Sequence, residues 1–367
     1  MTRVLLINQD RIPHYRVAVY NYLSDFLYRN EFKLTVVSGG VQGGADHTIR
    51  FDYREIQLSF LNLAKFIYRE NPGVILFWVN LKNTYLFPTL LISKVFGKKI
   101  IYWGHGRDLL DQNSKIKNVA FAFEHWICDA IILYAEHIKK YVPKKFHNKV
   151  FIANNTLNMT EFHYNLLSKD MIFKKYNIKT KKNIIYVGRI QKRRRLHDLL
   201  MAFERMNKQD IGLILVGPDE DGILQGSNGN NIYKLGPIYG EDKFALLSAS
   251  DVYCLPGAVG LSIVDAFYCG LPMVTEDVDE SPEIMYLKDG INGFVVPKGD
   301  IQKLAEKLSL LIEDDGLRER FSRLAKNEIM SNGHIDLMCK GFTEALRFCI
   351  GTNQTRKRIG TQKTQDV

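Results

Sequence analysis

Residues 255–272 read LPGAVGLSIVDAFYCGLP and carry the clearest structural signal in the chain. An apolar run ends at Leu255, a loop with glycines at 257 and 260 follows, and a helical pattern then continues to Gly270. Glycine is favoured just beyond the end of a helix, and Pro272 cannot continue one. The stretch therefore predicts a strand, a glycine-containing loop and a short helix that begins near Gly260.

The same order of elements recurs on both sides of this stretch. Short runs rich in β-branched and aromatic residues alternate with segments of helical period. These runs lie at 4–7, 33–37, 74–79, 99–103, 130–134, 150–153, 184–187, 213–216, 232–235, 252–255 and 273–275. Alternating strands and helices of this kind predict an α/β protein with parallel sheets covered by helices on both faces.

The length of 367 residues favours two domains. Apolar density falls between Asn155 and Lys182, so we expect a first domain at 1–168 and a second at 169–350. The last helix of the second domain is expected either to stay with it or to pack back on the first. Residues 351–367 are polar and basic, which predicts a disordered tail.

The net charge of +10 is concentrated in the first half of the chain, where residues 1–150 carry 21 basic and 12 acidic side chains. Such an excess is typical of proteins that bind nucleic acid, an anionic membrane or a phosphorylated ligand. No RRM, helix-turn-helix or zinc signature is present, so nucleic acid is not the expected partner, although it stays an alternative. We expect attraction to anionic lipid through Lys94, Lys98, Lys99, Lys139, Lys140, Lys144 and Lys145.

No charged segment followed by an apolar stretch precedes Val4, which predicts a cytoplasmic chain that contacts the inner face of the plasma membrane. The most apolar region, 74–102, is interrupted by lysines and asparagines. None of its uninterrupted apolar runs is long enough to span a bilayer. The five cysteines are odd in number and far apart, which favours buried thiols over a zinc site or disulfides.

Ligands of open α/β sheets bind beyond the carboxyl ends of the strands, so polar residues there are the candidates. The first strand is followed by Asp10, Arg11, His14 and Arg16, without the GxGxxG of an NAD site. The strand at 99–103 is followed by His105 between two glycines, which would let the ring approach a ligand closely. A turn histidine without a role is the alternative.

Two strand ends in the second half predict a site for a nucleotide diphosphate. Gly188 precedes five cations within residues 189–195, a pattern suited to a diphosphate, with a solvated basic turn as the alternative. The N–H groups of Leu261 and Ser262 would be unpaired at a helix start, where phosphate binds. Asp265 would lie one turn further on the same face and accept from a ribose.

Taken in order, these motifs resemble the retaining glycosyltransferases of the GT-B fold, in the large bacterial family four. The matching segments are Val187-Gly188-Arg189 with Arg194, Leu215–Pro218, Leu235–Ile238, Gly260–Ala266, and Pro282-Glu283 with Asn292-Gly293. The resemblance covers nearly the whole chain and is strongest in its second half. It implies two Rossmann-like domains whose parallel sheets face each other across a cleft.

The resemblance also implies roles for individual residues. Arg189 and Arg194 would bind the donor diphosphate and stabilise its departing charge, and the backbone around Ile238 would contact the nucleobase. Asp265 would hold the ribose, and His105 would lie near the transferred sugar. The first domain would bind the acceptor through the four polar residues that follow its first strand.

One position departs from the family pattern, because Gly257 stands where the family has its first glutamate. We expect the donor sugar to be held instead by the backbone of Ala258 and Val259 or by Glu283, with Gly260, Leu261 and Ser262 completing the donor site. A relative that binds sugar nucleotides without catalysis is the alternative.

The implied reaction transfers a hexose or N-acetylhexosamine from a nucleotide-diphosphate sugar to a saccharide or lipid-linked saccharide in bacterial surface polysaccharide synthesis. A UDP-sugar is favoured, and GDP-mannose is the second choice. No metal and no cofactor are expected, since the sugar nucleotide is a substrate. The acidic runs Asp219-Glu220-Asp221 and Asp277-Val278-Asp279 are expected to be loop tips. The sequence leaves the oligomeric state open.

Overall fold

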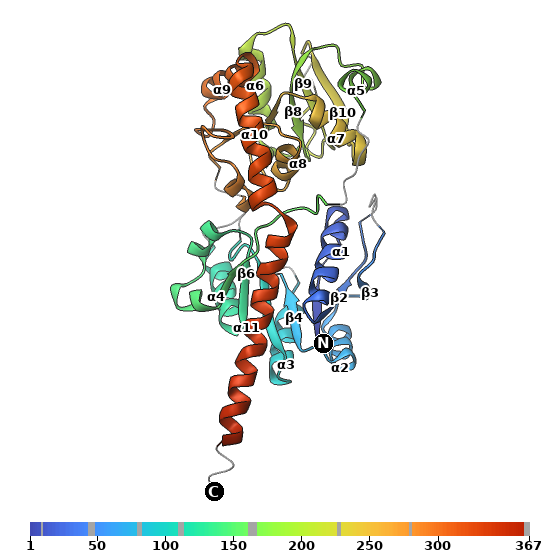
Figure 1. The fold of residues 1–367 in the computed structure, drawn as a ribbon, viewed down its shortest axis with the longest axis vertical. Helices are drawn as coiled ribbons and strands as arrows, with labels where there is room; N and C mark the ends of the chain where they lie inside the picture. The colour runs from blue at the N-terminus through green and yellow to red at the C-terminus, as the bar shows by residue number, and fades with distance from the viewer. Residues whose placement is uncertain are drawn as a thin grey trace. The chain divides into compact units, whose positions relative to one another are not determined.

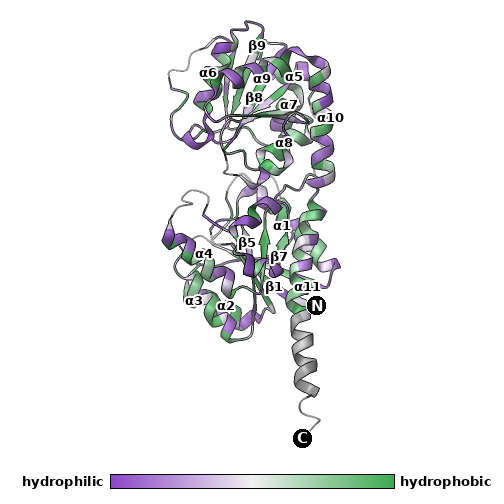
Figure 2. Ribbon diagram, turned by 90° about the vertical axis from the view of Figure 1, so that its left-hand side faces the viewer, coloured by the Kyte–Doolittle hydropathy of each residue, from purple (hydrophilic) through white to green (hydrophobic). Residues whose placement is uncertain are grey.

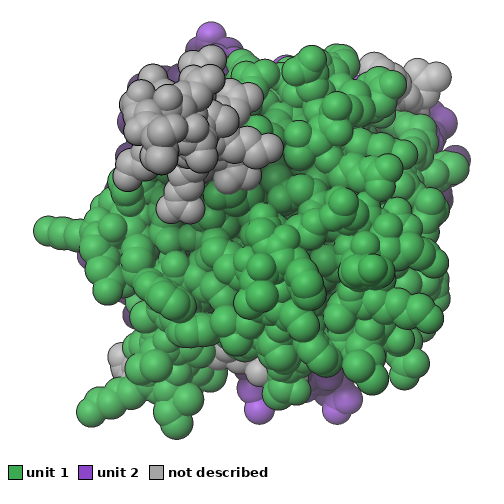
Figure 3. All heavy atoms as spheres, turned by 90° about the horizontal axis from the view of Figure 1, so that it is seen from below, with its two compact units in different colours: residues 1–158, 335–367 green, residues 159–334 purple. Residues whose placement is uncertain are grey.

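The chain forms two compact units, shown in different colours in Figure 3. The computed structural model describes residues 1–8, 10–42, 48–78, 83–108, 114–160, 167–225, 229–278 and 281–362, with only the backbone described beyond 351. The first unit combines Met1–Asn158 with Ile335–Val367, and the second is the continuous segment Met159–His334. The boundary expected from the sequence lies about ten residues later, and residues up to 350 were expected in the second domain.

The first unit is built on a seven-stranded parallel sheet in the order β3-β2-β1-β4-β5-β6-β7 (Figure 1). Its strands are β1 Thr2–Ile7, β2 Phe32–Ser38, β3 Asp52–Glu55, β4 Val74–Phe77, β5 Lys99–Gly104, β6 Ala130–Leu133 and β7 Val150–Ile152. Most of their residues are buried, because helices cover both faces of the sheet.

The helices of the first unit form one layer on each face of the sheet. They are α1 His14–Arg29, α2 Phe60–Glu70, α3 Leu86–Val95, α4 Lys115–Ile127 and α11 Ile335–Gln362, with 3-10 turns η1 Glu136–Tyr141 and η2 Lys144–Lys149. Helix α1 packs against α11, while α2 packs beside α3. The helices are divided between the two faces because parallel crossovers are right-handed. The connection from β1 to β2 runs in one direction along the sheet and that from β4 to β5 runs in the other.

The last helix, α11, completes the first unit. It packs on β6 and β7, and its inward side chains Met338, Phe342 and Leu346 are fully buried. A Cβ on Gly341 would lie 2.1 Å from the Ile152 carbonyl oxygen, so only glycine lets the helix lie this close to β7. The helix continues to Gln362, which differs from the disorder predicted from residue 351 onward.

The second unit has a six-stranded parallel sheet in the order β10-β9-β8-β11-β12-β13. Its strands are β8 Lys182–Val187, β9 Ile211–Val216, β10 Ile232–Gly236, β11 Val252–Cys254, β12 Met273–Glu276 and β13 Gly293–Val296. Its helices are α5 Lys169–Lys175, α6 Leu196–Met206, α7 Gly240–Ala249, α8 Ser262–Tyr268, α9 Ile301–Glu313 and α10 Asp315–Asn332, with turns η3 Lys192–Arg194 and η4 Pro282–Tyr286.

Every run predicted as a strand from its composition contains a strand, although Val79 of the run at 74–79 lies outside the described residues, while β3 and β13 were not predicted. Strand β3 reads DYRE and is partly exposed at the edge of its sheet, so it lacks an apolar run. Strand β13 begins at Gly293, where a Cβ would lie 2.2 Å from the Met273 carbonyl oxygen. Both strands have four residues and a composition that their edge positions allow.

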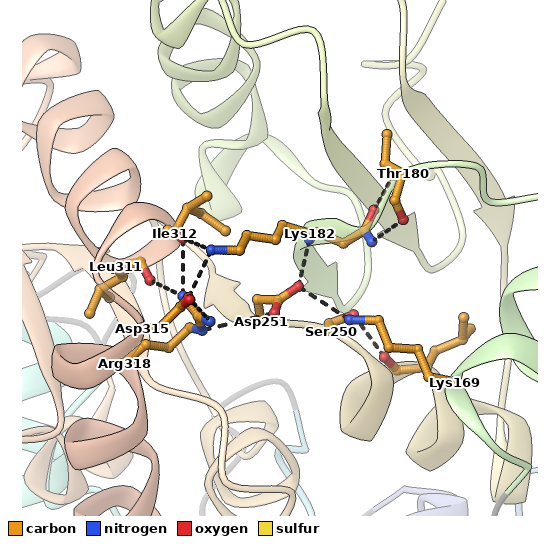
Figure 4. Close-up of polar contacts among 11 residues, drawn as sticks. Lys169, Thr180, Lys182, Ser250, Asp251, Leu311, Ile312, Asp315 and Arg318 are labelled. Carbon is orange, nitrogen blue, oxygen red and sulfur yellow. Dashed lines mark hydrogen bonds and ion pairs between the residues drawn. The ribbon is translucent and has the colours of Figure 1, made fainter.

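Paired charges join neighbouring elements at the end of the second sheet where its strands begin, which we call the amino edge (Figure 4). The opposite end, where the strands finish, is the carboxyl edge. Asp251, just before β11, accepts the Asn183 N–H at 2.8 Å, and Arg318 and Lys169 lie 3.8 and 3.7 Å from its carboxylate. Lys182 donates to Asp315 at 2.7 Å. These contacts join β8 and β11 to helices α5 and α10.

Among the described residues, no helix combines the length and the apolar character needed to cross a bilayer.

Candidate functional site

The order of strands in the second sheet reverses direction between β8 and β11. Connections from these two neighbouring strands leave toward opposite sides, and such a reversal is where open α/β sheets bind ligands. The loop after β8 (188–195) and the loop after β11 (255–261) meet there. The Gly257 N–H donates to the Arg194 carbonyl oxygen at 3.0 Å, which joins the two loops.

Arg189 presents an open guanidinium at this edge. Its side chain is 55% exposed, and the nearest carboxylate oxygen, on Glu220, lies 4.0 Å away. Its carbonyl oxygen accepts the Tyr186 hydroxyl at 2.9 Å, so the backbone is fixed while the side chain is not. A half-exposed ion pair at this distance contributes little to stability. The cation is therefore available to an anionic ligand.

Arg194 is held by neutral groups. Its Nη1 donates to the carbonyl oxygens of Ala258 and, at 2.7 Å, of Val259, while its buried Nε has no partner among the described residues. Its Nη2 lies 3.4 Å from the place of a Cβ on Gly260. The guanidinium is thus oriented along one edge, with no carboxylate of the described residues within ion-pair distance, which suits binding of a phosphate.

The structure explains the glycine at 257. A Cβ there would lie 2.2 Å from the Arg193 carbonyl oxygen, so the two loops leave no room for a side chain. The Ala258 N–H donates to the same oxygen at 3.3 Å, and Ala258 and Val259 are buried. The expectation that the Ala258 backbone holds a donor sugar is corrected, because its N–H is already used; these residues support Arg194.

The start of α8 is braced by a serine that no sequence motif marked. Gly260, at φ +61°, donates its N–H to the Ser281 hydroxyl at 2.9 Å, and that hydroxyl is hydrogen bonded to the Glu283 carboxylate. The Ser262 hydroxyl donates to the Val259 carbonyl oxygen at 2.8 Å. Helix α8 begins at Ser262, so the N–H groups of its first turn have no acceptor within the helix. Leu261 precedes that turn.

Asp265 is buried with one oxygen satisfied. Its Oδ2 accepts from Lys243 of α7 at 2.8 Å, while its Oδ1 has no partner among the described residues. A buried oxygen without a donor is uncommon in proteins and suits a ligand hydroxyl. Lys243 was not predicted, because a lone lysine in a helical pattern carries no sequence signal.

The loops after β9 and β10 close against the loop after β8. A Cβ on Gly217 would lie 1.9 Å from the Gly188 carbonyl oxygen, and the Gly217 N–H donates to the Gly236 carbonyl oxygen at 2.8 Å. Ile238 follows two residues later and is half-buried. The glycines therefore bring its backbone to the edge that carries Arg189.

Arg195, the last cation of the basic run, has a structural role. Its Nε donates to Glu276 at 2.6 Å, and it also pairs with Asp198. Glu276 is 1% exposed, and burial together with the Asp198 carboxylate raises its pKa to about 7. The charge of Arg195 is thus used to fix the start of α6 and is not available to a ligand.

The acidic run at 219–221 braces loops. Asp219 accepts the N–H groups of Ile223 and Leu224, each at 2.9 Å, and Asp221 accepts the Lys192 N–H at 2.7 Å. Asp279 of the other run lies outside the described residues. Among the residues that the structure describes, no group of three or more His, Cys, Asp and Glu side chains could hold a metal ion.

In the first unit, the strand order reverses between β1 and β4. Asp10 and Arg11 follow β1 and are exposed, and His14 begins α1. Burial and then the charge of Asp10 raise the pKa of Tyr85 to about 12, so Asp10 lies near the residue that precedes α3. Three of the four predicted acceptor residues therefore gather at this edge.

The fourth predicted acceptor residue, Arg16, is taken up by the fold. It is 8% exposed, its guanidinium lies 4.9 Å from the ring centroid of Trp103, and it donates to Asn155 at 2.8 Å. A guanidinium stacked and hydrogen bonded in this way joins α1 to β5 and to the segment after β7. Its expected contact with an acceptor is corrected accordingly.

His105 is fixed by aromatic neighbours. Its ring lies 4.7 Å from that of Tyr134 in an edge-to-face contact. The hydroxyl of Tyr102 accepts the Gly106 N–H at 2.9 Å, and a Cβ on Gly104 would lie 2.4 Å from that hydroxyl. Of the two glycines expected to let a ligand approach the ring, Gly104 makes room for Tyr102, and Gly106 lies beside Val142 and Leu133 in the left-handed backbone region at φ +76°.

Each unit is thus a Rossmann-like domain with polar side chains gathered where its strand order reverses, and two such domains define the GT-B class of transferases. The Anabaena protein HepE, solved in complex with UDP-glucose, superposes with a TM-score of 0.76 at 15% identity, over 94% of this chain and 99% of that one.

Residues 168–328 match the family described as Glycosyl transferases group 1. An uncharacterized glycosyltransferase of Methanocaldococcus jannaschii is 25% identical over 293 residues, 74% of this chain and 73% of that protein. A phosphatidyl-myo-inositol mannosyltransferase of Mycobacterium leprae is 32% identical over 150 residues, 38% of this chain and 40% of its own length. The matched residues make up most of the second unit, so this part of the chain is similar to the group 1 glycosyltransferases.

Proposed function

We propose that this chain transfers a hexose or N-acetylhexosamine, with retention of configuration, from a UDP-sugar to a saccharide or lipid-linked saccharide in bacterial surface polysaccharide synthesis. One observation carries the proposal: Arg194, held by carbonyl oxygens, and Arg189, whose exposed side chain makes only a 4.0 Å ion pair with Glu220, lie at the sheet edge that also presents Asp265 Oδ1, an oxygen without a partner among the described residues. Cations and a buried acceptor in this arrangement suit a diphosphate joined to a ribose.

The two arginines account for the departure of the nucleotide. Breaking the bond between sugar and phosphate leaves negative charge on the diphosphate, and cations oriented beforehand stabilise that charge in the transition state. Arg194 is oriented by the Val259 carbonyl oxygen, so it loses little freedom on binding. No metal ion and no cofactor are part of the proposal.

The ribose and the base would bind beside the arginines. Asp265 would accept from a ribose hydroxyl through Oδ1, while Lys243 donates to Oδ2 and fixes the orientation of the carboxylate. The backbone around Ile238 would contact the base. For the donor sugar, whose usual glutamate is replaced by Gly257, the candidates are Glu283 and the first N–H groups of α8.

The acceptor would bind to the first unit near Asp10, Arg11, His14 and His105. In a retaining transfer the acceptor hydroxyl attacks from the face that the diphosphate leaves. A diphosphate oxygen takes its proton, so the chain does not have to supply a separate base. Arg16 would support this edge through Trp103.

The nucleobase and the acceptor are proposed by comparison with relatives. HepE was solved with UDP-glucose, whereas the M. leprae relative is named a mannosyltransferase, so GDP-mannose is the second candidate donor. The name of the M. leprae relative also includes a lipid, phosphatidyl-myo-inositol. We propose that the chain works in the cytoplasm at the membrane surface, without a nucleic-acid partner.

A thermal-shift screen with UDP, GDP, UDP-glucose, UDP-N-acetylglucosamine and GDP-mannose tests the donor site. A nucleotide that binds only the folded chain raises its melting temperature, by an amount that grows with concentration. We expect the largest rise with uridine nucleotides, and Arg189→Ala should abolish it without lowering the melting temperature of the free chain. An unchanged shift in this variant would refute the phosphate site, and binding without turnover of any donor would indicate a non-catalytic relative.

A further inference from the structure

The outer surface of helices α3 and α4 is apolar although it is exposed. Val95, Ile116, Val119 and Trp126 are 83%, 85%, 69% and 63% exposed, and Phe96, which caps α3, is 65% exposed. The three residues on α4 at 116, 119 and 126 recur with helical spacing, so they form one stripe along it.

The stripes on the two helices form one surface. The rings of Phe87 on α3 and Phe123 on α4 lie 6.1 Å apart, and Phe123 lies 5.8 Å from Trp126. The helices also lie side by side in the same layer of the first unit (Figure 2). We call this surface the α3–α4 face and define it by Leu91, Val95, Phe96, Ile116, Val119 and Trp126.

The core of the first unit does not need these side chains. Helix α3 already buries Leu86 and Leu90 completely, and α4 buries Phe121 and Ile127 against the sheet. Both helices therefore have an apolar face on each side, whereas a helix on the surface of a soluble domain needs only one. A contiguous exposed apolar surface is typical of an interaction site.

The charges around the α3–α4 face are basic. Lys94, Lys98, Lys115 and Lys117 lie on or beside the two helices, and the single carboxylate within them, Glu124, is fully buried. Part of this positive charge is neutralised, since Lys94 and Lys99 both pair with Asp129 and Lys117 lies 2.9 Å from the Asp108 carboxylate. Charge alone would therefore attract an anionic surface less strongly than the sequence suggests. The exposed apolar side chains add to the affinity for such a surface.

We infer that the α3–α4 face docks on an anionic phospholipid bilayer, with its apolar side chains in the interfacial region and its lysines among the headgroups. Apolar side chains with a tryptophan, next to lysines, suit the boundary between acyl chains and anionic headgroups. The inference refines the membrane contact in the proposed function, and it is tested without any transfer reaction.

A second copy of the chain fits this face less well. A symmetric dimer would place the same surface of both copies together, and so would bring lysines against lysines. A bilayer with anionic lipid supplies the opposite charge to these lysines. The charge complementarity therefore favours lipid over self-association.

Flotation of the full chain with vesicles tests this inference. We expect binding to vesicles of phosphatidylcholine with phosphatidylglycerol, and retention of part of it at high salt, because the apolar contribution is not screened. The pairs Val95→Ser with Phe96→Ser, and Ile116→Ser with Val119→Ser, should each lower the partition coefficient roughly ten-fold or more. The matched pair Met201→Ser with Met330→Ser, exposed methionines of the second unit, should have no effect.

Tryptophan fluorescence gives a second measurement. Of the three tryptophans, Trp103 is 1% exposed, Trp78 is half-buried and lies outside the α3–α4 face, and Trp126 is exposed on it, so vesicles should shift the emission to shorter wavelength through Trp126. The Trp126→Phe variant should lose this shift and still float.

Three results would overturn the inference: no binding to anionic vesicles, serine pairs that float like the wild type, or a dimer in light scattering that the serine pairs dissociate. The thermal shift with UDP should be the same in all these variants. Absence of vesicle binding can therefore be distinguished from absence of nucleotide binding at the donor site.

Discussion

The two edges of the sheet in the second unit carry similar charged side chains and use them differently. At the amino edge, Lys182 and Arg318 contact carboxylates of Asp315 and Asp251, so each cation has an anion nearby (Figure 4). At the carboxyl edge, Arg194 is held by carbonyl oxygens, and Arg189 lies 4.0 Å from its nearest carboxylate.

This difference shows how a fold separates stability from binding. Cations that pair with carboxylates join neighbouring elements and have little charge left for a ligand, whereas a cation held by neutral oxygens keeps its attraction for anions. The amino edge should therefore respond to mutation through stability, and the carboxyl edge through activity.

The largest effect is expected from Arg194→Ala. Loss of an oriented cation at the leaving diphosphate should lower kcat/KM by roughly 10²–10³-fold. Arg193→Ala is the matched control, since its Nε donates to Gln191 at 3.1 Å on the same exposed turn. Steady-state kinetics with the donor found in the thermal-shift screen measure both, and equal losses in the two variants would contradict the assignment.

Asp251→Ala should act at the opposite edge through stability. Removal of its carboxylate leaves the Asn183 N–H without its acceptor and takes a carboxylate away from Arg318, at a cost of about 1–3 kcal/mol in the free energy of unfolding. Denaturant unfolding measures the loss. The KM for the donor should stay unchanged, and an altered KM at full stability would break the proposed division between the edges.

Glu276→Gln should change how stability depends on pH. The raised pKa of Glu276 means that the folded chain holds a proton which the unfolded chain has released, so stability present at low pH is lost as pH rises through about 7. The glutamine does not ionise, so the variant should lose less, by on the order of 1–2 kcal/mol between about pH 5 and about pH 8. Identical melting curves of variant and wild type across this range would refute the cause given for the shift.

The smallest effect is expected from Asp265→Asn. The amide keeps the shape and one acceptor oxygen but loses the charge, so the KM for the donor should rise by about three- to ten-fold with little change in kcat. Lys243→Met serves as comparison, because it leaves the carboxylate in place and removes only its cation. A fall in kcat alone would place Asp265 elsewhere in the reaction.

The sequence predicted the strands with an apolar core, the strand end that carries Arg189 and Arg194, and the short helix that carries Asp265, because all three follow from local patterns. It could not predict which charges are paired. Arg194 and Arg195 are neighbours of the same type, yet one meets carbonyl oxygens and the other meets Glu276, 81 positions away. Arg16 was likewise assigned to a ligand, because its stacking on Trp103 depends on two distant elements.

The route of the chain through the two units also sets an order of synthesis. The second unit is continuous, so it can finish folding as soon as residue 334 has left the ribosome. The first unit starts earlier and has to wait, because α11 supplies buried residues such as Met338 and Phe342 from the end of the chain. A nascent chain stalled before α11 should therefore hold a folded second unit beside an incomplete first one, which makes the first-made part of this protein the last to mature.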